Sequence, residues 1–481
     1  MYTMHQPDGP RTLVQVASAG LLLSILSAPA VAQQGAVPIR VVSAPVATTM
    51  EPIHFPAEVQ ELAGGRLLVN ATADRRLLVF DRSLKTATVL ADTNGDVAVY
   101  PRFSRLIRYL GDSVLFFEAA TRSLILVGEE GRLGRVIALP KAQDANNITN
   151  NMPVGVDARG RLIYAGRRPF RFPPSCRVID GRATRDSLPA PATDSVTILR
   201  ADFDTRSVDT IGRARVSVSG VTFPAMVTDA NCRVISAKVR IDPSVPEVDS
   251  WTVTSTGQVA IVRGHDYHVD WIDASGTQRS TPKLPFDLRR YTDADKQARV
   301  DSARRIVDSL VALGGYRLQA CGSSFAFNTS PPSDQVAGPG SPSRGGAGGG
   351  GGAVGGGGGG RAAVGVGTTG GGALPSTRDC QTVTATAEYP ALDEMPNYLA
   401  PVREAAARAD RDGNVWILPT TSAGAKGGLL YDVVNAKGEL AERVQLPANR
   451  DIAGFGKDGV LFLSHRADDG SISIERVDVV R

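Results

Sequence analysis

Three short apolar runs near the C-terminus decide the fold: GNVWIL (413–418), LLYDVV (429–434) and RVQLP (443–447). Each run is rich in β-branched or aromatic residues and is bounded by turn-forming residues, which is typical of short strands joined by hairpins. The same unit recurs along the chain, each time behind a glycine in a turn. The six copies begin at Gly65, Gly111, Gly160, Gly257, Gly413 and Gly459.

The spacing of the copies predicts their size. The leading glycines of the first two copies are 46 residues apart (65 to 111), and so are those of the last two (413 to 459). This period fits a blade of four antiparallel strands. We therefore predict an all-β fold, a six-bladed β-propeller. The sixth copy lacks a fourth strand, and we expect residues 38–42 (PIRVV) to supply it, which would close the propeller and remove two sheet edges.

Four of these segments resemble a known group of proteins. DGNVW (412–416), YDVV (431–434), QLP (445–447) and YHVDW (267–271) are similar to the turns and strands of secreted bacterial six-bladed β-propeller proteins of NHL-like type. The resemblance extends over most of residues 37–481. It implies a propeller fold and export, and only loosely a function, because these motifs are turn and strand chemistry and not catalytic signatures.

The N-terminus has the pattern of a secretory signal. Arg11 supplies a positive charge, an apolar stretch follows at 19–26, and Ala-Val-Ala at 30–32 fits a cleavage site. We expect residues 1–32 to be a cleaved signal peptide and the mature protein to be secreted or periplasmic; an uncleaved anchor is the alternative. No later segment approaches membrane-spanning length, so no transmembrane segment is expected after cleavage.

Export makes the four cysteines candidates for disulfides. There is no C-x-x-C pair among Cys176, Cys232, Cys321 and Cys380, so neither a zinc ribbon nor a thioredoxin-like site is indicated. Four cysteines allow three pairings. We favour Cys176 with Cys232 and Cys321 with Cys380, because the second bridge would tie both ends of a glycine-rich insert. Four buried free thiols are the alternative.

Beyond the signal, residues 37–481 are predicted to form a single β-propeller domain that carries insertions. Residues 286–320 contain a helix signal, in which Thr292 and Asp295 match a capping box and apolar residues follow at helical spacing. We expect this helix to lie on one face of the propeller.

Three further segments do not fit the repeat. Residues 331–375 are Gly-, Pro- and Ser-rich and almost free of large apolar side chains, so we predict that they are disordered. Residues 141–153 and 166–194 are expected to be polar loops. The polyglycine does not indicate a phosphate-binding loop, because no Gly-Lys-Ser/Thr follows it.

Composition and motifs argue against nucleic-acid binding and point to one candidate metal site. The net charge of +4, from 53 basic and 49 acidic residues, gives no case for a nucleic-acid binder. Asp92, Asn94 and Asp96 place oxygen atoms at alternate positions, as calcium loops do, and are the candidate metal ligands. The loop departs from the EF-hand pattern, because its glycine is fourth and Phe103 stands where the twelfth-position Glu would bind. An ordinary turn is the alternative.

No signature assigns a reaction. Neither a G-x-S-x-G elbow nor an H-E-x-x-H motif is present, so the catalytic residues are unknown, and no cofactor is expected apart from the calcium considered above. We predict an exported, monomeric, non-catalytic binding protein whose partner is an unidentified protein, glycan or small molecule at the channel mouth or loop face. The alternative is a divalent-cation-dependent hydrolase or lyase, similar to a lactonase, that acts at the central channel.

Overall fold

The computed structural model describes residues 37–480 with gaps. The gaps are 52, 55–56, 95–97, 102, 150–151, 169–174, 180–181, 187–193, 218–224, 230–233, 316, 322–323, 329–379, 425–426 and 468–470. The predicted signal (1–32), the glycine-rich insert (331–375), Asp96 and Cys232 therefore lie outside the described residues. Residues 38–481 form one compact unit.

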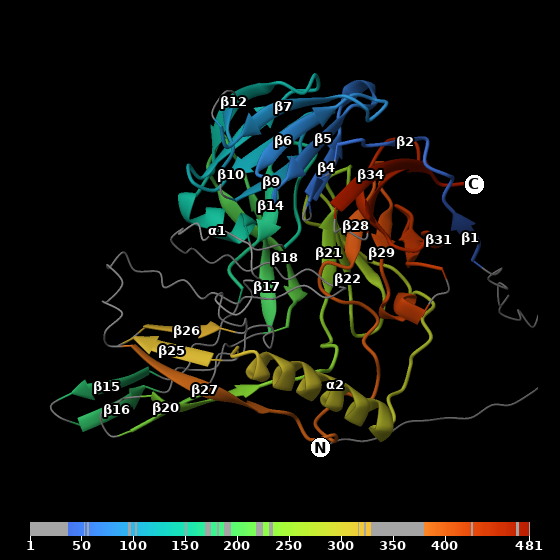
Figure 1. Ribbon diagram of the computed structural model, residues 1–481. Helices are drawn as coiled ribbons and strands as arrows, with labels where there is room; N and C mark the ends of the chain where they lie inside the picture. Colours follow the sequence, from blue (N-terminus) through green and yellow to red (C-terminus); the bar gives the residue numbers. More distant parts are fainter. Residues whose placement is uncertain are drawn as a thin grey trace, which may run out of the picture. The chain divides into compact units, whose positions relative to one another are not determined.

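The described chain is mostly β, and six successive sheets make up most of it (Figure 1). The first holds β4 (Ala57–Glu61), β5 (Leu67–Ala71), β6 (Arg76–Phe80), β7 (Ala87–Asp92) and β8 (Ala98–Val99). The second holds β9 (Ser104–Arg108), β10 (Val114–Glu118), β11 (Ser123–Val127) and β12 (Leu133–Ala138). The third holds β13 (Val154–Val156), β14 (Leu162–Ala165), β17 (Ser195–Ala201) and β18 (Val208–Arg215).

The remaining three sheets follow the same plan. The fourth holds β21 (Ser250–Val253), β22 (Val259–Val262), β23 (Val269–Ile272) and β24 (Gln278–Ser280). The fifth holds β28 (Ala407–Ala409), β29 (Val415–Ile417), β30 (Leu430–Val434), β31 (Leu440–Gln445) and β1 (Ile39–Val41). The sixth holds β32 (Arg450–Phe455), β33 (Val460–Arg466), β34 (Ser471–Asp478), β2 (Ala47–Thr48) and β3 (Ile53–His54).

The glycine that begins each sequence copy has the same structural place in every sheet. All six lie in the turn between the first and second strand, and all six have a positive φ, between 64° and 87°. A residue with a Cβ is strained in this region, whereas glycine adopts it freely. The repeat seen in the sequence is therefore the repeat of one hairpin.

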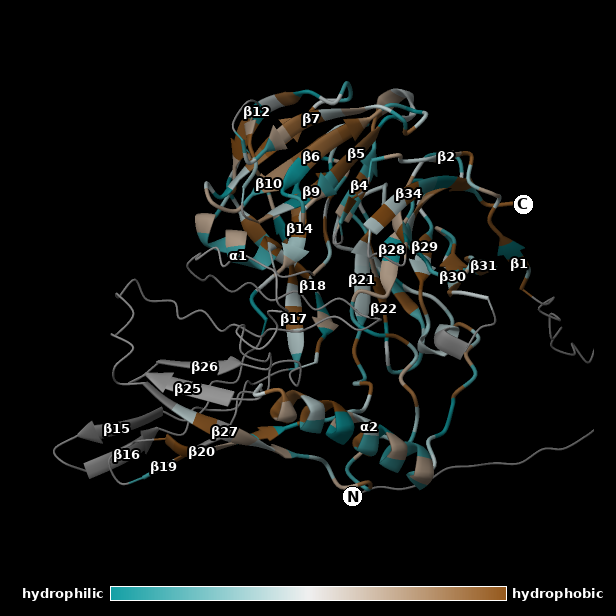
Figure 2. Cartoon of the chain, viewed as in Figure 1, coloured by the Kyte–Doolittle hydropathy of each residue, from teal (hydrophilic) through white to brown (hydrophobic). Residues whose placement is uncertain are grey.

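The inner strands of the six sheets are buried on both faces. Along β29, Trp416 packs with the sixth sheet while Val415 and Ile417 pack with the fourth, because successive side chains of a strand point to opposite faces. Shared cores join each sheet to the next, and a further core joins the sixth to the first, where Phe80 and Phe462 belong to one cluster. This two-sided burial explains why β5 and β6 are mostly apolar (Figure 2).

The N-terminal strands pair differently from the prediction. Residues 38–42 were expected to complete the sixth sheet, but β1 pairs in parallel with β31 of the fifth sheet. The segment that follows completes the sixth sheet, since β2 and β3 both pair with β34 in antiparallel fashion. The predicted segment reaches the last strand of the sixth sheet only at its end, where Val42 bridges Val479. The pairings of β2 and β3 were not predicted, because each is two residues long and has no apolar alternation. Two single residues hold the β2–β3 segment in place. The Ile53 side chain is fully buried, and the hydroxyl of Thr49 accepts a hydrogen bond (3.0 Å) from the Ile474 amide.

The insertions form a further sheet that was not predicted. It holds β19 (Ala225–Thr228), β20 (Val234–Arg240), β27 (Cys380–Glu388), β25 (Arg317–Cys321) and β26 (Ser324–Asn328). The predicted helix is α2 (Asp293–Ala312), and its capping box is formed by Thr292 and Asp295. Helix α2 packs on this sheet, where Val307 shares a core with Ala237 and Ala385 (Figure 1).

Short elements occupy the segments that we expected to be loops. Residues 166–194 contain the hairpin of β15 (Ser175–Ile179) and β16 (Arg182–Asp186), which is a correction to the loop prediction. Residues 141–153 contain the 3₁₀ turn η2 (Ala142–Asp144) and α1 (Ala145–Ile148). Two other 3₁₀ turns are η1 (Ala63–Gly65) and η6 (Thr420–Gly424). In the described part of the chain, no helix combines the length and the apolar character needed to cross a membrane.

Candidate ligand-binding cavity

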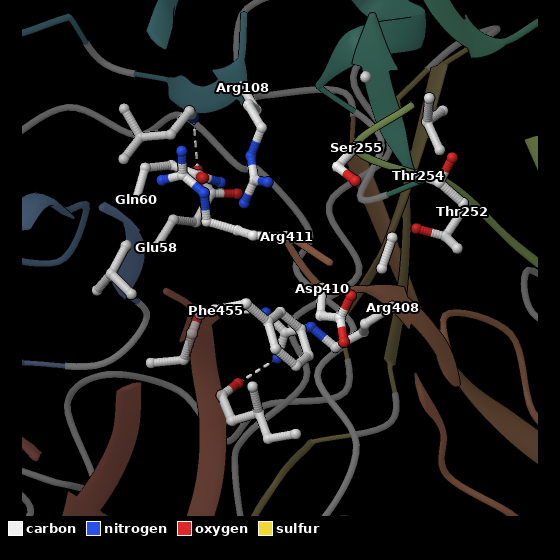
Figure 3. A pocket seen from close by; sticks show the side chains of 18 of the residues that line it. Glu58, Gln60, Arg108, Thr252, Thr254, Ser255, Arg408, Asp410, Arg411 and Phe455 are labelled. Carbon is white, nitrogen blue, oxygen red and sulfur yellow. Dashed lines mark hydrogen bonds between the residues drawn. The ribbon is translucent and has the colours of Figure 1, made fainter. Parts of the chain in front are cut away.

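The first strands of the six sheets surround a cavity of about 1070 Å³. Each of β4, β9, β13, β21, β28 and β32 contributes lining residues, and so do the turns that follow several of them. Arg108 and Arg411 lie on one side in Figure 3, and Thr252, Thr254 and Ser255 lie across the cavity from them. The walls are strands with cores behind them, so the lining groups are held on a rigid frame.

A buried ion-pair network crosses four of the sheets beside this cavity. The Arg411 guanidinium, which is 6% exposed, donates to a carboxylate oxygen of Asp112 and to the Glu61 carbonyl (2.8 Å). The other Asp112 oxygen accepts from Lys457 Nζ at 2.7 Å. Burial opposes ionisation of Asp112, but the hydrogen bond from Lys457 and the Arg411 charge outweigh it and hold the pKa of that carboxyl below its ordinary value of 3.8.

We expect Asp112→Asn to lower the free energy of unfolding by about 2 kcal/mol at neutral pH, because it removes the nearest carboxylate from the buried Arg411. A carboxyl with a depressed folded-state pKa stabilises the fold above its unfolded pKa and loses that effect as the pH falls through the folded value. The gap between wild type and variant should therefore close below about pH 4. Urea unfolding across pH measures this, with the exposed Asp287→Asn as the control. A gap independent of pH would contradict the pairing.

Two other carboxylates near the cavity, those of Asp410 and Glu58, already have donors. Asp410 accepts from the backbone amides of Asp412 and Asn414, and its second oxygen accepts from Trp416 Nε1 at 3.0 Å. Glu58 accepts from the Leu106 amide at 2.8 Å. These carboxylates fix turns and strands, and their negative charge is not directed at a ligand.

The guanidinium of Arg408 also has hydrogen-bond partners within the protein. It donates to the carbonyls of Ile452 and Ala453 on β32 and lies 5.7 Å from the centre of the Phe455 ring. Burial lowers the pKa of Arg408, although it keeps its charge at neutral pH. Arg408 therefore fastens the fifth sheet to the sixth at the cavity wall.

Arg108, Gln60 and Thr252 are among the polar side chains of the lining that have no such partner within the described residues. In the described part of the chain, Arg108 and Gln60 form no side-chain hydrogen bond or ion pair, and the hydroxyl of Thr252 has no hydrogen-bond partner either. Arg108 ends β9, Gln60 lies in β4 and Thr252 lies in β21, so they come from three sheets (Figure 3). Burial, together with the neighbouring Arg411 charge, lowers the pKa of Arg108 to about 10.

Two of the candidate calcium ligands, Asp92 and Asn94, do not line this cavity. Asp92 is the last residue of β7, and its carboxylate accepts a hydrogen bond (2.9 Å) from the Asn94 amide, which is the geometry of an ordinary Asx turn. The third residue, Asp96, lies outside the described residues. Across the described ranges there is no group of three or more His, Cys, Asp or Glu residues placed to hold a metal ion.

Two of the four cysteines are brought together in the backbone. Cys321 on β25 and Cys380 on β27 are directly opposite each other in an antiparallel pair. Opposed residues in such a pair have Cα atoms about 4.5 to 5.5 Å apart, which is within the range that a disulfide spans. Cys176 lies on β15, and its predicted partner Cys232 is outside the described residues.

The sequence contained a signal for the cavity that motif searching missed. Counting back five residues from each leading glycine identifies one lining residue in every sheet. These residues are Gln60, Leu106, Gly155, Thr252, Arg408 and Gly454. Because this position lies on the first strand of every sheet, the repeat register predicts a wall residue even where no motif exists.

Comparisons with known proteins show only weak likeness. No protein-family model and no curated protein matches the chain. A solved streptogramin B lyase is 10% identical, with 90% of this chain and 96% of that chain covered and a TM-score of 0.32. A catalytically inactive virginiamycin B lyase from Staphylococcus aureus with quinupristin is 8% identical, covers 89% and 99%, and has a TM-score of 0.33. A DUF4221 family member from Bacteroides vulgatus is 8% identical, covers 90% and 98%, and has a TM-score of 0.31. Likenesses at these scores carry no argument about activity.

Proposed function

We propose that this chain is an exported, monomeric, non-catalytic binding protein built as a six-bladed β-propeller, which β2 and β3 close against β34. Two observations support the propeller: shared cores connect the six sheets in succession, and their six first strands line one cavity. The charged, apolar and small-residue pattern of residues 1–32 supports export.

The ligand in this proposal is a small molecule held in the central cavity. The observation that carries it is the set of polar side chains, Arg108, Gln60 and Thr252, that line about 1070 Å³ and find no partner within the described chain. Unpaired polar groups in a partly buried site cost stability, and convergent polar groups in a pocket of this size are typical of small-molecule sites. A bound ligand would supply the missing partners.

The alternative is a hydrolase or lyase that uses a divalent cation in the channel. Such an ion takes several oxygen ligands, usually including carboxylates. The carboxylates of Asp410, Asp112 and Glu58 are engaged by protein donors, and the described residues contain no group of three potential ligands. A cation at this cavity would therefore need ligands other than these three carboxylates.

A cavity-filling variant tests the proposal. Gln60→Trp places an indole inside the cavity, and Gln278→Trp places the same side chain on the exposed outer strand β24. In a thermal-shift screen of small metabolites, we expect compounds that raise the Tm of the wild type and of Gln278→Trp but not of Gln60→Trp. Binding that survives Gln60→Trp would point to the loop face and a protein or glycan partner. Stoichiometric calcium, whose removal lowers the Tm, would favour the enzyme alternative.

We also propose the Cys321–Cys380 disulfide, which the opposed positions on β25 and β27 support. In protein recovered from an oxidising compartment, non-reducing peptide mapping is expected to show these two cysteines in one linked peptide. Reduction should separate the two peptides. Alkylation of both thiols without prior reduction would contradict the bridge, and the pairing of Cys176 with Cys232 stays a prediction that the same map checks.

A further inference from the structure

Arg108 occupies an unusual position for a cation. It is the last residue of β9, is only partly exposed, and lines the central cavity. Its strand is fixed, since Arg108 is paired with Val114 of β10. Burying a guanidinium without a hydrogen-bond acceptor is costly, and proteins normally offset that cost with a carboxylate or carbonyl.

The carboxylates nearest to Arg108 do not serve as that partner. The charges that act on it come from Asp410, Glu61 and Asp112, together with the like charge of Arg411. Asp112 is held by Arg411 and Lys457, and one Glu61 oxygen accepts from the Lys457 amide at 2.9 Å. Asp410 is saturated by its own turn and by the Trp416 indole. The donors of Arg108 are therefore left to face the cavity.

We propose that the ligand of the central cavity carries a carboxylate and that the Arg108 guanidinium binds it. This deepens the proposed function, on which it rests, by naming the chemistry of the ligand. The planar fork of a guanidinium matches both oxygens of a carboxylate. Gln60 and Thr252, which come from the two facing strands β4 and β21, offer an amide and a hydroxyl for other polar groups of the same ligand.

The residues around Arg108 favour a ligand with a single negative charge over one with two. A phosphate dianion at Arg108 would lie close to the carboxylates of Asp112 and Asp410, which already contribute to the potential there. Like charges in a low-dielectric site repel strongly. A monocarboxylate balances the charge of Arg108, whose guanidinium has no partner in the described part of the chain, and adds no second charge.

Matched pairs of probes test this with the whole mature protein. Hexanoate and phenylacetate are compared with hexanamide and phenylacetamide, which have nearly the same shape without the charge, and inorganic phosphate is the dianion. We expect the two carboxylates to raise the Tm of the wild type and the amides to have little effect. Arg108→Gln should weaken carboxylate binding by about 10- to 100-fold, and Arg108→Lys by less, because lysine keeps the charge but not the fork.

A second measurement shows whether the effect is one of recognition or of folding. Without ligand, Arg108→Gln should be as stable as the wild type or more so, because it removes a charge without a partner, whereas Arg411→Gln should be less stable. Phenylglyoxal should modify Arg108 faster than Arg411, since the Arg411 guanidinium is 6% exposed and bound to Asp112 and Glu61, and the carboxylates should protect Arg108.

The possible results distinguish the carboxylate hypothesis from the proposal that the cavity is the binding site. Equal shifts from the amides, unchanged carboxylate binding in Arg108→Gln, no carboxylate effect at all, or tighter binding of phosphate would overturn the carboxylate assignment. If uncharged compounds bind the wild type and Gln60→Trp abolishes that binding, the cavity is still the ligand site and only the ligand chemistry is wrong. If Gln60→Trp changes no binding, the proposed function itself fails.

Discussion

Replacing Trp416 by alanine is expected to lower the free energy of unfolding by about 4 kcal/mol. Trp416 is 2% exposed and packs between the fifth and sixth sheets, with ring centres 5.4 Å from Phe455 and 6.0 Å from Tyr431. Its indole nitrogen also donates to Asp410, the carboxylate that fixes the turn before β29. The substitution leaves a cavity and removes that hydrogen bond. Denaturant unfolding of the purified mature protein measures the effect.

Two matched variants separate these contributions. Trp416→Phe keeps most of the packing but loses the indole donor, and should cost about 1 to 2 kcal/mol. Val136→Ala removes an apolar side chain that is 64% exposed, and should cost less than about 0.5 kcal/mol. A surface-like effect of Trp416→Ala would show that the core between these two sheets is misassigned.

Removing residues 37–54 is expected to destabilise the protein by at least about 3 kcal/mol and to promote association. This truncation deletes β2 and β3, with the buried Ile53, and leaves the edge of β34 unpaired along its length. Removing only 37–45 takes away β1 and the contacts of Ser43, and should cost about 1 kcal/mol. Thermal unfolding and light scattering of the two truncated proteins measure the difference.

Point variants check the same contrast without shortening the chain. Ile53→Ala should cost about 3 kcal/mol because its side chain is fully buried. Ile39→Ala on β1, where the side chain is 61% exposed, should cost less than about 0.5 kcal/mol. If the longer truncation were as stable and as monodisperse as the shorter one, the pairing of β2 and β3 with β34 would not hold the sixth sheet together.

Local periodicity predicted the repeated part of the fold well. The leading glycines have a positive φ, so the hairpin turns are recognisable in the sequence as regularly spaced glycines. The inner strands are buried on both faces, so they are recognisable as apolar runs. The helix that begins after Thr292 was predicted for a similar reason, since a capping box is a local signal.

Features that depend on distant pairing were not predictable in this way. The partner of β1 is decided by packing against β31, about 400 residues later, and no local pattern encodes it. The inserted sheet joins strands as far apart as Val234–Arg240 and Cys380–Glu388 in parallel. Arg108 belongs to no motif, and its role at the cavity follows only from what the neighbouring carboxylates already bind.

The bridge between Val42 and Val479, together with the hydrogen bond from the Val480 amide to the Val41 carbonyl (3.0 Å), brings both extremities of the described chain to one spot. A short peptide could join them with little distortion, and new termini could be opened in the exposed turn at Ser275. Such a circular permutant would keep every strand pairing. The order in which the sheets are synthesised would therefore change, while the folded structure would stay the same. For the same reason, affinity tags attached at the two ends of the described chain would lie close together on the surface.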